Sequence, residues 1–223
     1  CGSNGKLIDE QTIVKPYVEA AIISDYVAPH GSIVKGQVRQ ESVTVNLNDR
    51  LSAFVWENYS FKEKAINERD FGLNYKIPLN KNFSAYVGAQ HWTYPSGTFG
   101  DFDDVLKAGI NYSGPIDLNL DVTHLLENKN TESGTRYYLK ASKSFQIYEN
   151  KKQDLKISFT PNVSTAWINN YYGKSGNSQA TIGFNLGLTK GNFNLNFFVN
   201  KQEGQIDGIE DFTWSGISAG WQF

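Results

Sequence analysis

The chain has 223 residues, a net charge of −2, 39% hydrophobic residues and 14% aromatic residues. The nearly balanced charge, without a basic cluster, argues against a nucleic-acid partner, and the single cysteine excludes an internal disulfide. The hydrophobic content is low for a soluble core, so the many aromatic residues indicate large apolar groups placed sparsely.

Residues 1–12 are polar and contain glycine, and we interpret them as a tether ahead of one domain at residues 13–223. The chain opens with Cys1-Gly2-Ser3-Asn4 and has no methionine. Two interpretations stay open: Cys1 carries lipid, as in a mature bacterial lipoprotein, or it is the start of an expressed fragment. Cys1 is therefore our candidate for lipid attachment.

From residue 14 onward, apolar and polar residues alternate almost without interruption. Ile182, Phe184 and Leu186, for example, alternate with Gly183 and Asn185. A period of two places successive side chains on opposite faces and predicts β-strands. No segment has a convincing helical period, and no run of about 18 apolar residues suggests a transmembrane helix. The strands are expected at 14–26, 35–47, 51–61, 69–77, 83–94, 104–112, 116–126, 135–146, 154–167, 179–190, 193–201 and 211–223.

The connections between these strands alternate between short and long. Asn48–Arg50, Pro78–Asn82 and Ser113–Pro115 are short, whereas 27–34 and 95–103 are longer. In an up-and-down meander every second connection lies at the same end, so one end would carry tight turns and the other would carry loops. Outer-membrane barrels show this asymmetry. We predict an all-β fold: a single antiparallel up-and-down transmembrane β-barrel of about 12 strands.

The predicted barrel turns its apolar face toward lipid and its polar face toward a lumen. The polar face holds Gly and Asn beside charged residues, which suits a crowded, hydrated lumen better than the outside of a soluble sheet. Because the charges are mixed in sign, they predict no ion selectivity. The candidate lumen-lining residues are Lys35, Arg39, Asp70, Lys76, Lys107, Asp117, Asp121, Arg136, Lys140 and Lys156.

The last residues resemble the C-terminal signal by which bacterial outer-membrane barrels are assembled. Ile217, Ala219, Trp221 and Phe223 alternate, and the final residue is aromatic. The resemblance implies a bacterial outer-membrane location, with the lipid bilayer and the barrel assembly machinery as partners. Trp221 and Phe223 are the candidate assembly signal. The alternative is an ordinary edge strand.

The sequence offers little support for catalysis or a cofactor. His30, His91 and His124 form no metal-binding motif, and a serine or amide partner for either of the last two would depend on the fold. The run Asp101, Asp103, Asp104 has the oxygen ligands that Ca²⁺ prefers, but it fits a solvated loop equally well. We therefore expect no metal, no cofactor and no enzymatic activity.

Two short motifs resemble the TorF-like porin family of small single-domain barrels. The segment "SDYVAPHGS", Ser24–Ser32, is similar to the family's S-[ED]-Y…G-x-S opening, and "HWTYPSG", His91–Gly97, is similar to a strand that ends in tyrosine-proline. The Arg-Gly that usually follows the opening is replaced here by Val27–Gly31. The resemblance implies a small outer-membrane barrel.

These observations predict a narrow porin-like channel for small hydrophilic solutes. About twelve strands enclose a lumen wider than that of an eight-stranded barrel and narrower than that of the general porins. Two alternatives stay open. One is a lipid-anchored barrel with a binding or structural role through its long loops, and the other is a barrel lipid hydrolase.

Overall fold

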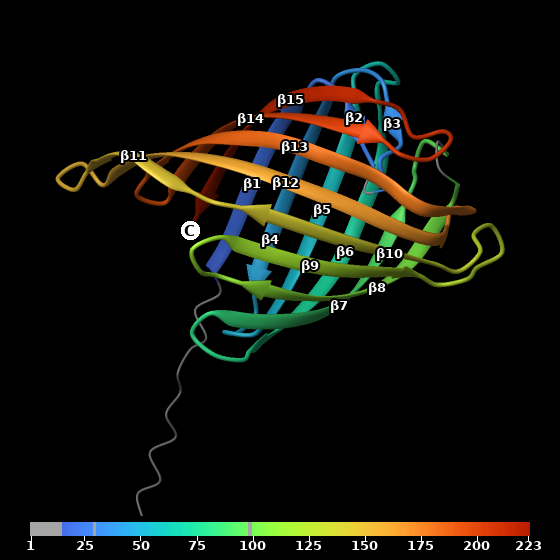
Figure 1. Ribbon diagram of the computed structural model, residues 1–223, viewed down its shortest axis with the longest axis horizontal. Coiled ribbons are helices and arrows are strands. Elements are labelled where there is room, and N and C mark those ends of the chain that lie inside the picture. Colours follow the sequence, from blue (N-terminus) through green and yellow to red (C-terminus); the bar gives the residue numbers. More distant parts are fainter. Residues whose placement is uncertain (1–14, 29, 98–99) are drawn as a thin grey trace, which may run out of the picture.

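The computed structural model describes residues 15–28, 30–97 and 100–223 as an all-β structure built around one closed barrel (Figure 1). The barrel contains twelve antiparallel strands, as the alternating sequence predicts. Among the described residues, no helix is long and apolar enough to cross a membrane. The barrel strands are β1 (Lys15–Ile23), β4 (Val38–Asn46), β5 (Leu51–Ser60), β6 (Ala65–Pro78), β7 (Phe83–Thr93), β8 (Phe102–Tyr112), β9 (Asp117–Leu125), β10 (Gly134–Ser142), β12 (Leu155–Tyr171), β13 (Lys174–Lys190), β14 (Phe193–Gly204) and β15 (Phe212–Gln222).

Two strand pairings close the meander into a barrel. β1 pairs with β15, so the first and last strands are neighbours, and β10 pairs with β12 from Ser142↔Asn162 to Thr135↔Asn169. Closure leaves the wall without an unpaired edge, which a membrane-spanning sheet requires because lipid cannot satisfy free backbone groups.

The two ends of the barrel differ as the connections predict. The turn end carries tight connections such as 47–50, 79–82 and 191–192, together with Lys15 and Gln222. The loop end carries the longer connections 24–37, 94–101, 126–133 and 205–211. The long gap expected between the strands at 154–167 and 179–190 is wrong: β12 extends to Tyr171 and β13 begins at Lys174, which leaves only a two-residue turn.

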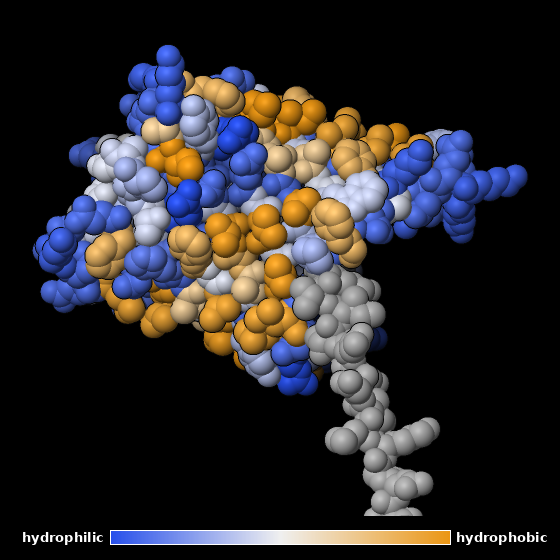
Figure 2. Space-filling view, turned by 180° about the vertical axis from the view of Figure 1, so that it is seen from behind, coloured by the Kyte–Doolittle hydropathy of each residue, from blue (hydrophilic) through white to orange (hydrophobic). Residues whose placement is uncertain are grey.

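The apolar face of the strands lies on the outside of the barrel. Ile182 is 62% exposed, Phe184 37% and Leu186 42%, whereas Gly183 and Asn185 are partly buried on the other face. Figure 2 shows apolar residues across the barrel wall, between hydrophilic loops at one end and a hydrophilic hairpin at the other. The predicted orientation of the alternating faces is confirmed for this wall.

The glycines of the inner face make room for aromatic rings from neighbouring strands. A Cβ atom at Gly72 would overlap the ring of Phe54, and one at Gly109 would overlap the ring of Tyr86. A ring can lie flat across the neighbouring strand only where that strand has no side chain. At these two positions a large ring lies over a glycine on the inner wall.

At the loop end the inside of the barrel carries apolar clusters beside buried polar residues such as Glu68 and Asp103. Trp92, Val105, Leu125, Ile168 and Tyr171 form a buried cluster there. A second cluster joins Ile23 and Val38 to Tyr26 and Ala28 of the first loop. The inner face is therefore mixed rather than uniformly polar at this end, and part of its apolar surface is covered by the folded first loop.

One predicted strand is interrupted. The segment 135–146 divides into β10 and β11 (Phe145–Asn150), and β11 pairs only with the start of β12, from Asn150↔Leu155 to Phe145↔Phe159. The resulting β11–β12 hairpin extends beyond the barrel wall at the turn end, on the left of Figure 1.

Candidate functional site

The loop between β1 and β4 folds into the mouth of the barrel as a small hairpin. Its strands are β2 (Tyr26–Val27) and β3 (Ile33–Val34), and backbone hydrogen bonds from Ala28 N to Ser32 O and from Gly31 N to Ala28 O, both 2.8 Å, close its turn. Tyr26 and Ala28 are only 5% and 6% exposed. We call the segment Tyr26–Val34 the mouth hairpin.

Contacts on two separate parts of the wall hold the mouth hairpin. Gln202 Nε2, on β14, donates a 2.7 Å hydrogen bond to Gly31 O, and Tyr26 OH donates to Glu68 on β6. At least four strands separate β6 from β14 in either direction around the barrel. The hairpin therefore crosses the mouth instead of lying along one side.

The mouth hairpin has a cavity on each side. One cavity, of about 370 Å³, is lined by Asp25, Val27 and Ala28 of the first loop and by wall residues that include Arg136 and Lys140. The other, of about 270 Å³, is mostly aromatic and includes Tyr26, Trp92 and Tyr172. Ala28 lines both cavities, so the hairpin separates them and narrows the route past it.

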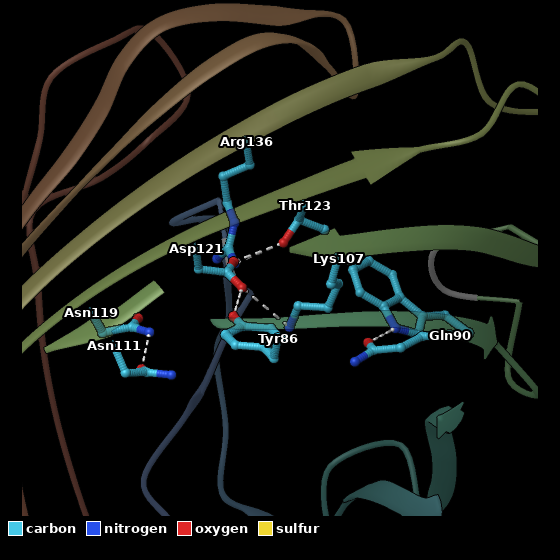
Figure 3. Close-up of polar contacts among 9 residues, drawn as sticks. Tyr86, Gln90, Lys107, Asn111, Asn119, Asp121, Thr123 and Arg136 are labelled. Atoms are coloured by element: carbon cyan, nitrogen blue, oxygen red, sulfur yellow. Dashed lines mark hydrogen bonds and ion pairs between the residues drawn. The ribbon is translucent and has the colours of Figure 1, made fainter. Parts of the chain in front are cut away.

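A buried ionic cluster centred on Asp121 projects into the lumen from four adjacent strands (Figure 3). Arg136 Nη2 lies 2.8 Å from Asp121 Oδ1, and Thr123 Oγ1 donates to the same oxygen at 2.9 Å. Tyr86 OH donates to Asp121 Oδ2, and Lys107 Nζ lies 4.0 Å from that oxygen. The side chains of Asp121 and Arg136 are only 6% and 9% exposed, so this cluster ties β7, β8, β9 and β10 together across the inner face.

Two further carboxyl groups lie nearer the mouth and receive only neutral donors. Asp103 Oδ2 accepts hydrogen bonds from Tyr94 OH at 2.8 Å and from Tyr172 OH at 2.7 Å. Glu68 accepts from Tyr26 OH. Tyr172 has a φ of 50°, a left-handed conformation that is uncommon for a bulky residue. This turn directs the Tyr172 hydroxyl to Asp103.

His30, in the mouth hairpin, is held among aromatic rings. Its ring centroid lies 5.1 Å from that of Tyr172 and 5.8 Å from that of Tyr171. Burial, together with the nearby positive charges of Lys174 and Arg136, lowers the pKa of His30 to about 4. His30 is therefore neutral at neutral pH.

A more open polar cavity of about 460 Å³ lies toward the turn end. Asn119 Nδ2 donates to Asn111 Oδ1 at 2.8 Å on its wall. Asp117 and Lys140 line the same cavity. Polar side chains thus continue along the inner face below the Asp121 cluster.

The structure brings some of the proposed lumen residues together and separates others. Lys107, Asp121 and Arg136 share one cluster, and Lys140 borders both polar cavities. Asp70 is on the inner face of β6, while Lys76 and Asp117 are exposed near the turn end. Lys156 lies opposite Glu149 in the backbone ladder of the projecting β11–β12 hairpin.

The predictions for Lys35 and Arg39 are wrong. Lys35 lies in the first loop, where its Nζ is 2.9 Å from Glu210 and both side chains are exposed. Arg39 is on the outward face of β4, 3.3 Å from Glu41, and its guanidinium covers the ring of Tyr59. Gln40, the next residue on β4, faces inward, so the side chain of Arg39 faces outward and does not line the lumen.

His91 and His124 also face outward, near the loop end. His91 Nδ1 lies 2.8 Å from Asp104 Oδ1, and His124 Nδ1 lies 2.9 Å from Thr135 Oγ1. The adjacent same-face positions around His91 in the described ladder contain no serine or cysteine. The His91–Asp104 pair therefore has no serine or cysteine nucleophile at these neighbouring positions.

The acidic run does not form a joint cation site in the described structure. Asp101 lies 3.2 Å from Lys129, Asp103 points inward to the tyrosines, and Asp104 points outward to His91. No group of three potential metal ligands gathers among the described residues.

The predicted assembly signal, Trp221 and Phe223, lies among the described residues. Trp221 belongs to β15, and its ring lies 6.4 Å from that of Phe193; Phe223 follows β15, and its N donates to Pro16 O at 3.0 Å at the turn end. Their role as an assembly signal stays a prediction. Cys1 and the tether at residues 1–12 lie outside the described residues.

Sequence reasoning missed the groups at the mouth. Glu68, Tyr94 and Tyr172 were not expected to meet, and "SDYVAPHGS" suggested a family resemblance rather than an inward hairpin. The available signal was the concentration of tyrosine, histidine and tryptophan at one end of the predicted strands, which resembled an aromatic girdle.

Comparisons with known proteins show a shared fold without a sequence relative. No protein-family model matches the chain, and no curated protein matches it in sequence. LpxR from Salmonella typhimurium has a TM-score of 0.62 at 8% identity, covering 93% of this chain and 100% of that chain. The KdgM porin has 0.60 at 10% identity, covering 93% and 99%. An outer membrane channel from Pseudomonas putida F1 has 0.55 at 11% identity, covering 94% and 95%.

These neighbours are outer-membrane β-barrel proteins, and the likeness extends over nearly the whole of each chain. At such low identities it shows the fold alone. Since no family model matches, the TorF-like resemblance stays a prediction.

Proposed function

We propose that this protein is a narrow outer-membrane channel for small hydrophilic solutes. The observation that carries the proposal is the mouth hairpin, which crosses the loop end with cavities of about 370 Å³ and 270 Å³ on its two sides. An inward loop narrows a polar lumen, which suits passage of small solutes better than free diffusion of large ones.

The outer surface supports a bilayer location for the barrel. Apolar side chains cover the middle of the wall, and outward pairs with a carboxylate, such as Arg69–Glu57 and His91–Asp104, lie toward the loop end. Charged side chains are costly at the bilayer centre and tolerated near its surface. This distribution fits a barrel whose loop end faces outward from the cell, with Trp221 and Phe223 as its assembly signal.

Planar-bilayer conductance of the purified full chain tests the channel. We expect discrete openings, and Gln202→Ala should increase the conductance or its fluctuations because it removes the hydrogen bond to Gly31 O. Gln146→Ala, in the projecting hairpin, is the matched control and should leave conductance unchanged. A correctly folded barrel that never conducts, even with Gln202→Ala, would overturn the channel and favour a binding role through the loops.

A further inference from the structure

The aromatic cavity beside the mouth hairpin has the composition of a preformed binding site. We call it the mouth pocket; its rings belong to Tyr26, His30, Trp92, Tyr94, Tyr171 and Tyr172. These residues come from the mouth hairpin, from the end of β7 and the residue that follows it, and from the end of β12 and its turn to β13, so the pocket forms only in the folded barrel. Its volume of about 270 Å³ suits one small molecule.

Packing among the rings holds the pocket walls in place. Tyr171 and Tyr172 meet edge to face, with centroids 5.1 Å apart and an interplanar angle of 89°. His30 packs on both of them. Trp92 is fixed by a 2.8 Å hydrogen bond from its Nε1 to Gln90 Oε1. The walls are therefore preorganised, which lowers the entropic cost of binding.

The pocket is next to carboxyl groups that have no cationic partner. Glu68 lines it, and Asp103 is close enough to Glu68 to interact electrostatically. Across the described residues, neither carboxyl group forms an ion pair, in contrast to Asp121 with Arg136 and Lys107. An ionised carboxylate is costly to bury with neutral donors alone, so a cation entering the pocket would stabilise the ionised form of Glu68.

The basic groups around the pocket do not supply that cation. Lys174 also lines the pocket, and its Nζ donates to Gly208 O at 3.1 Å in an exposed hydrogen bond. His30 is neutral at neutral pH. Tyr171 is 0% exposed, and its hydroxyl has no hydrogen-bond partner within the described part of the chain, although the residue lines the pocket.

We propose that the mouth pocket binds a small quaternary or methylated ammonium cation. Aromatic faces attract such cations through the ring quadrupole, most strongly when the cation is desolvated. The methyl groups would pack against Trp92, Tyr94 and Tyr172, and Glu68 would provide the countercharge. The claim that such cations are the solutes of the channel rests on the proposed function. Binding of the cation in the mouth pocket does not depend on conduction.

Calorimetric titration of the folded full-length barrel in detergent with choline tests the pocket. The matched probe is 3,3-dimethyl-1-butanol, which has the same shape and hydroxyl group but no charge. We expect choline to bind about ten-fold more tightly than the alcohol, because only the cation gains from the rings and the carboxylate. Equal affinity for choline and the alcohol would mean that the site is only an apolar cavity, and it would contradict the proposal. Absence of choline binding would also overturn it.

Substitutions locate the binding within the pocket. Glu68→Gln keeps an acceptor for Tyr26 and should weaken choline binding about ten-fold while leaving the alcohol unaffected. Glu57→Gln removes an outward-facing carboxylate and is the control. If Glu68→Gln does not fold, Trp92→Leu should also weaken choline binding. A folded variant of either kind that retains full choline affinity would contradict the assignment.

The result is separable from the channel proposal. Choline binding without conductance would support the pocket and refute the channel. Conductance without choline binding would support the channel and refute the pocket.

Discussion

Substitution within the Asp121 cluster is the strictest test of whether the described lumen buries its ionic groups. The substitution is Asp121→Asn. The substitution removes the negative charge that Arg136 meets at 2.8 Å and Lys107 at 4.0 Å. The Arg136 side chain is only 9% exposed, so water cannot readily replace the lost partner. Breaking a buried ion pair on one side costs about 3–5 kcal/mol, and we expect a loss of about 3 kcal/mol because Thr123 still contacts Arg136 at 3.1 Å.

The assay is equilibrium urea unfolding of the barrel in lipid vesicles, followed by tryptophan fluorescence. With an m-value of about 2 kcal/mol per molar, the midpoint should fall by about 1.5 M. Asp117→Asn is the matched control, since Asp117 lies on the same face of the same strand but is exposed; it should change the free energy of unfolding by less than about 0.5 kcal/mol. Adding Arg136→Gln to Asp121→Asn should recover part of the loss.

Equal effects of Asp121→Asn and Asp117→Asn would refute the reasoning. That result would mean that water screens the Asp121 cluster as fully as it screens the exposed turn end.

Three further predictions concern the hairpin, the inner wall and the outer face. Because the pKa of His30 is about 4 in the folded protein against an ordinary 6.5, its stabilising contribution is complete above pH 6.5 and is lost as the pH falls toward 4. The loss amounts to about 3 kcal/mol, so channel fluctuations should increase on acidification, and His30→Gln should remove that dependence. Gly72→Ala should cost about 1–3 kcal/mol of unfolding free energy by overlap with Phe54; if Phe54→Leu in the same chain recovers none of it, the ring is not the cause. Phe184→Arg should cost about 2–4 kcal/mol in bilayers, and Asn185→Arg less than half as much; equal costs would contradict the assignment of faces.

The strand pattern predicts the barrel well because one physical cause acts on every residue. A strand with one face in hydrocarbon must alternate, so Ile182, Phe184 and Leu186 identify the outer face without tertiary information. Phe54 and Trp56, two aromatic residues on the same face of β5, show the limit of this rule. Val55 is on the outward face, and the Phe54 ring lies inside over Gly72. Aromatic residues fit either face, so their side depends on the neighbouring strand.

The mouth could not be predicted in the same way. Its groups meet because the hairpin bends inward, which depends on contacts such as Gln202 to Gly31 O between positions far apart in the sequence. Alternation also fails to reveal where a strand changes partner, so β11 appeared to continue β10. Local periodicity gives the face of a residue in a regular strand, whereas loop packing and partner exchange depend on the whole fold.

The central claim is that the polar face encloses a water-filled route while the apolar face lies in lipid. Cysteine accessibility tests it directly at two neighbouring positions of β10. Lys140 borders the polar cavities, and Leu139 is 48% exposed on the outside. In a Cys1→Ser background, the account predicts that a water-soluble methanethiosulfonate reagent lowers the bilayer conductance of Lys140→Cys and leaves that of Leu139→Cys unchanged. An unaffected Lys140→Cys channel, or an equal effect at both positions, would contradict it.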